Sequence, residues 1–200
     1  MAKKKSKRTP GKKVIRKSHP KRGKKRGAAG SASAPRGNAE VMRAVELFKW
    51  VHEMTGKLCA GFSESQMLTQ PSPSDNHLLW QIGHMATGYA YFASMLDGKP
   101  STLGEMYDKL FGWGSKPSSD TSTYPAHAEI RRIHDEQYTR ILRAASALSD
   151  ADGLSAPATD SGGFAKNKLD VVSKCIWHEG WHQGQISGLR RALGLPGVMG

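Results

Sequence analysis

Two histidines one helical turn apart are the residues of this chain with the clearest chemical potential. They are His178 and His182, in the stretch Trp-His-Glu-Gly-Trp-His-Gln-Gly-Gln that begins at Trp177. Side chains at positions i and i+4 of a helix project from the same face. This spacing suits two ligands of one divalent metal ion. The alternative is a pair of core histidines bonded to other polar side chains.

The same residues also spell the HExxH pattern of zinc peptidases, with Glu179 in the place of the general base. Such enzymes need a third ligand downstream, but the segment after His182 contains no His, Asp, Glu or Cys. The sequence therefore argues against a peptidase, and a third ligand is expected upstream. Glu179 lies about 100° around the helix from its histidine neighbour and is a candidate acid–base residue.

His84 is the best candidate for the third ligand. It lies on a segment that is apolar nearly all round, and Gly83 beside it permits another element to approach closely. His52 and His134 fall on or beside other apolar stripes and stay open as alternatives. The histidines near predicted helix starts, which we expect on the surface, are His77 and His127.

We expect structural or surface roles for several neighbours of the histidine pair. Cys175 shares the face of the pair, and we interpret it as a small buried thiol. Gln185 is expected either to support a metal ligand or to bond within the fold. Arg190 and Arg191 are expected on the surface or in a dimer contact.

Four amphipathic segments must position these side chains. Their apolar residues recur at steps of three and four, which predicts helices, and no β alternation separates them. The predicted helices cover about 40–62, 77–96, 123–148 and 168–193. The connection 98–123 is long for a bundle, and the MYDKLF stretch inside it predicts a short helical turn. The pattern is typical of an all-α, up-down four-helix bundle with one long crossover.

Charge divides the chain into two parts. Residues 1–39 contain fifteen Lys and Arg and no acidic residue; subtracting this +15 from the net charge of +13 leaves −2 on residues 40–200. The first part is rich in Gly and Pro and is predicted to be a disordered basic tail, ahead of a single domain. It is either a solvated extension or a non-specific nucleic-acid contact driven by charge.

The sequence predicts neither a signal peptide nor a membrane span. The basic stretch is not followed by the apolar segment of a signal peptide. Residues 78–96 have no formal charge, but their Gln, His, Ser and Thr favour a buried helix over a membrane span. Two cysteines in 200 residues suit a reducing compartment, so we predict a cytoplasmic protein.

Two stretches resemble the DinB-like (DinB/YfiT) superfamily. HEGWHQGQISGLRRALGLP is similar to its last helix, and NHLLWQIGHMATGYAYF is similar to its second helix. The resemblance covers roughly residues 40–196 and leaves out the basic tail. It implies a four-helix bundle, often a homodimer, that holds a divalent ion such as zinc or nickel on three histidines. Transferred to this chain, the ligands are His84, His178 and His182.

The superfamily includes transferases that use low-molecular-weight thiols, so the resemblance leaves two classes of function open. One is a metal-dependent enzyme that transfers a small thiol to an electrophile or hydrolyses a small substrate. The other is a non-catalytic metal-binding or stress-associated protein, held near nucleic acid by its tail. An enzyme would need the 98–123 connection and nearby aromatic residues to form a cleft over the metal.

Overall fold

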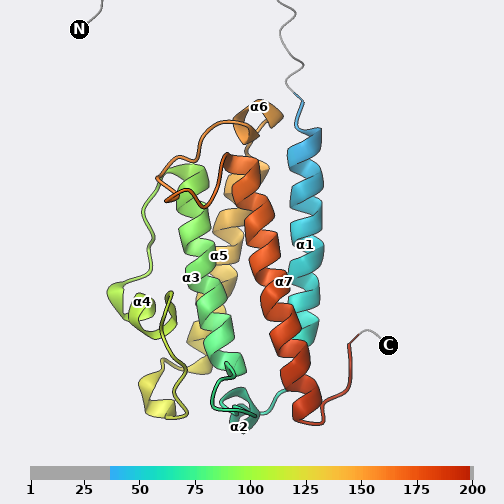
Figure 1. Cartoon of the computed structure of the whole chain (residues 1–200), viewed down its shortest axis with the longest axis vertical. Helices are drawn as coiled ribbons and strands as arrows, with labels where there is room; N and C mark the ends of the chain where they lie inside the picture. The colour runs from blue at the N-terminus through green and yellow to red at the C-terminus, as the bar shows by residue number, and fades with distance from the viewer. Residues whose placement is uncertain (1–36, 199–200) are drawn as a thin grey trace, which may run out of the picture. The chain divides into compact units, whose positions relative to one another are not determined.

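In the computed structural model, which describes residues 37–198, four long helices pack around one apolar core (Figure 1). They are α1 (Ala39–Cys59), α3 (Leu78–Asp97), α5 (His127–Ser146) and α7 (Lys168–Ala192). Short helices occupy the connections: α2 (Glu64–Met67), α4 (Glu105–Phe111), the 3-10 turn η1 (Thr121–Thr123) and α6 (Asp150–Gly153). There is no strand between residues 37 and 198, so the all-α bundle is confirmed. Of the disordered tail predicted over residues 1–39, residues 1–36 lie outside the described residues, and α1 already begins at Ala39.

Side-chain contacts give the helix directions. On α1 and α7, His52 meets Glu179 and Leu58 meets Arg190, so these helices run parallel. On α3 and α7, Gln81 meets His182 and the earlier part of α7 meets the later part of α3, so this pair is antiparallel. The connection after α3 returns along its side and makes α5 parallel to α3 (Figure 1). This is the predicted long crossover.

The predicted helix ends were accurate to within about four residues. The helix predicted over 40–62 ends at Cys59, because Ala60 is extended and Gly61 has a φ of 80°. The predicted turn in the crossover is α4. α3 ends as expected at Gly98, which has a φ of 71° that favours glycine.

The expected surface position of His77 is wrong. Its side chain is 0% exposed, and its Nδ1 accepts a hydrogen bond from the backbone N–H of Trp80 at 3.0 Å. His77 is therefore the N-cap of α3. A buried imidazole replaces the usual small cap because the crossover covers this end, where the Ser118 carbonyl lies 3.0 Å from His77 Nε2.

α3 is the most deeply buried helix of the bundle. Fourteen of its residues are buried, including the polar Gln81. No helix in the described part of the chain is long and apolar enough to cross a membrane. The apolar character of residues 78–96 is explained by contacts with α4, α5 and α7, which surround α3.

Candidate metal centre

α3 and α7 bring three histidines together. His84, His178 and His182 each offer a nitrogen within 4.8 Å of those of the other two. The Nε2 atoms of His84 and His178 are 3.3 Å apart, and the three ring centroids lie 4.8–5.2 Å from one another. The three side chains meet because the turn of α7 that carries His178 and His182 lies opposite His84 on α3.

Two of the rings have a fixed tautomer. The Nδ1–H of His84 donates to the Phe111 carbonyl at 2.6 Å, and that of His182 donates to Gln81 Oε1 at 3.2 Å. The amide of Gln81 is itself oriented, because its Nε2 donates to the Asn76 carbonyl at 2.8 Å. Both Nε2 atoms therefore carry a free lone pair. A histidine that ligates a metal through one nitrogen typically donates the other N–H in this way.

His178 completes the group without such support. Its Nδ1 is buried and has no hydrogen-bond partner among the described residues. Its ring lies close to Gly88, where an added Cβ would come within 2.9 Å of the imidazole. Three buried nitrogens that face one another, two with free lone pairs, are a donor set that a divalent ion would satisfy.

Burial keeps the three imidazoles neutral. Burial is the larger cause, and repulsion between neighbouring histidines the smaller, of a pKa lowered to about 2 for His182 and to about 4 for His178. The pKa of His84 is also lowered by burial, although its hydrogen bond to Phe111 opposes the shift. Protons therefore compete weakly for these nitrogens near neutral pH, and an ion held by them would keep its full positive charge.

The crossover reaches the site through Phe111. An added Cβ on Gly83 would lie 2.3 Å from the Phe111 ring, so only glycine lets α4 approach α3 this closely. The Phe111 carbonyl, which holds His84, also accepts from Thr87 Oγ1 at 3.2 Å. Trp80 stacks on His84 with centroids 4.6 Å apart. The sequence indicated that Gly83 allows another element to come close. It did not indicate that this contact places the Phe111 carbonyl beside His84.

Gln81 was the other missed residue. Its side chain is 1% exposed in the most apolar helix of the chain, and it lies three residues before His84. A glutamine in a helix that is otherwise apolar all round is a signal that sequence reasoning can use, since a buried amide requires hydrogen-bond partners.

Glu179 does not face the histidine triad. It is fully buried on the α1 side, where Oε1 accepts from Thr55 Oγ1 at 2.6 Å and lies 3.2 Å from His52 Nδ1. This position leaves it no acid–base role at the triad. Cys175 is buried as expected, and burial raises the pKa of its thiol well above the usual value, with the charge of Glu179 adding to the shift.

The alternative ligands form a separate group. His52 lies on α1 and His134 on α5, and their rings stack at 5.4 Å with 19° between their planes. Each offers a ligand atom within 4.8 Å of the other and of the Asp135 carboxylate. Neither belongs to the group formed by His84, His178 and His182.

The expected surface position of Arg190 is wrong. Its side chain is buried, and the guanidinium donates to the carbonyls of Leu58, Ala60 and Pro196. These carbonyls lie at the end of α1 and beyond the end of α7. Arg190 therefore links the C-terminal ends of α1 and α7, whereas Arg191 is exposed. Because arginine carries several donors, it can satisfy carbonyls that a helix end leaves free.

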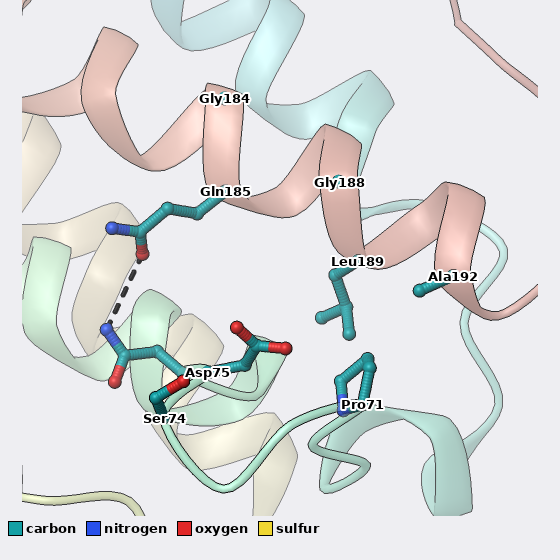
Figure 2. A pocket seen from close by; sticks show the side chains of 9 residues that line it. Pro71, Ser74, Asp75, Gly184, Gln185, Gly188, Leu189 and Ala192 are labelled. Atoms are coloured by element: carbon teal, nitrogen blue, oxygen red, sulfur yellow. Dashed lines mark hydrogen bonds between the residues drawn. The ribbon is translucent and has the colours of Figure 1, made fainter.

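A cavity of about 420 Å³ lies one turn along α7 from the triad (Figure 2). It is walled by the loop before α3 and by α7, with residues Pro71, Ser74, Asp75, Asn76, Gly184, Gln185, Gly188, Leu189 and Ala192. Gln185 Oε1 accepts from Asn76 Nδ2 at 3.5 Å, the dashed line of Figure 2. A second cavity, of about 360 Å³, lies between α1 and α7. Neither is lined by a triad histidine or by the crossover, so neither is the expected cleft over the metal.

The sequence profile of the DinB superfamily matches residues 47–186, which is more than half of the chain. This chain belongs to the DinB superfamily. The match contains all three triad histidines and excludes the basic segment. No curated protein matches the chain closely enough to count as a relative. This DinB protein thus combines membership of the superfamily with a histidine group that could hold a divalent ion.

Proposed function

We propose that this DinB protein holds a divalent metal ion on His84, His178 and His182 and uses it to transfer a low-molecular-weight thiol. The observation that carries the proposal is the pair of oriented imidazoles. The Phe111 carbonyl and Gln81 Oε1 accept hydrogen bonds from the Nδ1–H groups of His84 and His182, which leaves the Nε2 atom of each ring unprotonated. Purely structural histidines would not need matching tautomers.

Three neutral ligands support a catalytic ion rather than a structural one. Such an ion would keep an open position, at which a thiol gives up its proton and becomes a nucleophile. The sulfur would then form a bond to the electrophilic carbon of a second substrate, whose leaving group departs with the bonding electron pair. The thiol proton would pass to solvent.

The surroundings leave an approach to the site. His84 and His178 are partly exposed, whereas His182 is 4% exposed. Trp181, three residues after His178, is 58% exposed and packs against the 57% exposed Trp177, with ring centroids 5.6 Å apart and 57° between the planes. Residues at i and i+3 are neighbours on a helix surface. An apolar aromatic surface beside the partly exposed His178 supports binding of an organic electrophile.

The test is thiol-dependent turnover by the full chain loaded with zinc, nickel or cobalt. The substrate is 1-chloro-2,4-dinitrobenzene, which releases chloride on forming a coloured thioether, with cysteine or glutathione as the thiol. We expect turnover that depends on metal, disappears in His182→Ala and persists in the control His127→Ala. A metal-loaded protein that never exceeds the uncatalysed rate with any small thiol would reject the transferase and favour the non-catalytic alternative.

We propose a second, separate role for the basic segment, which is contact with nucleic acid. Fifteen Lys and Arg without one acidic residue support this reading, because such clusters release counterions from phosphates. Removing residues 1–36 should abolish binding to duplex DNA and leave the free energy of unfolding within about 1 kcal/mol. Gly37 must be kept, because its carbonyl accepts from the Asp150 N–H at 2.9 Å. Binding that survives the deletion, or that does not weaken with salt, would contradict this role.

A further inference from the structure

We propose that His52, His134 and Asp135 form a second divalent-cation site, on α1 and α5 and separate from the triad. The three residues offer ligand atoms that all lie within 4.8 Å of one another. α1 and α5 run antiparallel at this level, where Phe48 meets Tyr138 and His52 meets His134. Two helices therefore contribute to the site, as in the triad.

His52 is held in the orientation that a ligand requires. Its Nδ1 lies 3.2 Å from Glu179 Oε1, and Tyr138 stacks on its ring with centroids 3.4 Å apart. Glu179 is fixed in turn by Thr55 Oγ1 at 2.6 Å. A carboxylate that accepts from Nδ1–H leaves Nε2 as the donor nitrogen. The side chain of His52 is 21% exposed, so this nitrogen is not sealed in the core.

His134 has an unsatisfied nitrogen. Its side chain is 10% exposed, and its Nε2 is buried without a partner among residues 37–198. An ion shared with Asp135 would be bound through the opposite nitrogen of this ring, because that nitrogen faces the carboxylate. The other nitrogen, Nδ1, lies 3.1 Å from Asp135 Oδ1.

Asp135 gives the site its charge and its opening. Its side chain is 74% exposed, so a bound ion would keep positions open to water. Two imidazoles and one carboxylate suit zinc, cobalt, nickel or ferrous iron rather than calcium, which prefers oxygen ligands. Asp135 and the buried Glu179 place two carboxylates around the histidine pair, whereas the triad has neutral side chains only. A cation therefore fits this group on charge as well as geometry.

The experiment measures how many Co²⁺ ions the full chain binds, by elemental analysis after gel filtration and by visible absorption during titration. The wild type should bind two ions, and the double variant His84→Ala/His182→Ala should bind one. Adding Asp135→Ala to that double variant should weaken the remaining site by about tenfold or more, and adding His134→Ala should do the same. His127→Ala, on the same helix, is the control and should change nothing.

Asp135→Ala keeps the test decisive even where a histidine variant fails to fold, because this exposed side chain contributes little to the core. Circular dichroism reports the fold of each variant. One Co²⁺ in both the wild type and the double variant would reject the triad and leave the second site standing. The second site would be overturned by a single wild-type Co²⁺ that the double variant loses. It would also be overturned by a double variant that binds none, or by an Asp135→Ala variant that titrates like the control.

Discussion

The two histidine groups of this bundle differ in what holds the imidazoles. In the triad, the supporting acceptors are the Phe111 carbonyl and the Gln81 amide, which are neutral. In the second group, the supporting acceptor of His52 is the Glu179 carboxylate, and the Asp135 carboxylate beside His134 is itself a proposed ligand. Neutral acceptors fix a tautomer without adding charge, so an ion in the triad would stay strongly electrophilic. Carboxylates increase affinity for a cation and reduce its charge.

The groups also differ in their burial. His182 is 4% exposed and the other triad rings face it from α3 and α7, whereas Asp135 extends into solvent. If the triad is the reactive site and the second group a binding site, residue type alone does not distinguish them. The acceptors behind the histidines and the depth of the group make that distinction.

The largest expected effect comes from removing a triad ligand. His182→Ala should abolish the proposed turnover by orders of magnitude and leave a folded bundle, because the apolar core does not include the ion. The metal's contribution to stability would be lost, on the order of 3–4 kcal/mol at several hundred to a thousand times Kd. Circular dichroism and metal content measure this. An unfolded variant would show that the triad is structural, and full triad occupancy would reject His182 as a ligand.

The crossover's support of the triad is tested by filling its close approach. Gly83→Ala should destabilise the protein by about 1–3 kcal/mol, since the buried Phe111 ring must move, and should displace the carbonyl that orients His84. The matched control is Gly180→Ala on α7, where an added Cβ meets nothing within 4 Å. The control should be stabilised by up to about 1 kcal/mol. Urea unfolding compares the two, and equal effects would contradict the tight contact.

Gln81→Leu separates tautomer control from ligand loss. All three histidines remain, but His182 Nδ1–H loses its acceptor, so metal affinity of the triad should fall about 10–100-fold. Gln185→Leu is the control, because the side-chain hydrogen bond of Gln185 among residues 37–198 is to Asn76, at 3.5 Å, and not to a triad histidine. Competition with a chromogenic chelator measures both. A Gln81 variant with unchanged triad affinity would show that the oriented amide is incidental, and the second group should be unaffected in either variant.

The pH dependence of the metal-free protein tests the burial of the triad. The unfolded chain protonates its histidines near pH 6.5, whereas burial lowers the pKa of His178 to about 4 and that of His182 to about 2. At a pH between the native-state pKa of a histidine and 6.5, the unfolded state binds more protons than the native state does. The free energy of unfolding therefore falls as pH falls. The slope should reach about 1.4 kcal/mol per pH unit for each histidine.

Urea unfolding of the metal-free protein at pH 7, 6 and 5 measures this slope. In His182→Ala it should be smaller by the share of one histidine, whereas His127→Ala should keep the wild-type slope. A His182 variant that keeps the full slope would mean that its imidazole does not resist protonation in the bundle.

The sequence predicted the bundle well because its apolar residues recur with helical period in four separate segments. The ends of helices were harder to locate, since His77 caps α3 only because the crossover buries it. Glu179 and Arg190 were misjudged for a related reason. Both charged side chains are buried, and each is accommodated by groups on α1 more than a hundred residues away in sequence. Spacing along one helix does not reveal such partners.

Spacing by itself placed His178 and His182 on one face, because the geometry of a helix is local. Charge and composition along the chain indicated the basic segment and the long crossover. Tertiary structure alone decided that His84 meets the pair, while His52 and His134 gather elsewhere. It alone supplied the Phe111 carbonyl and the Gln81 amide. Which groups meet depends on the directions of four helices, and the free energy that sets those directions is distributed over the whole apolar core rather than held in any motif.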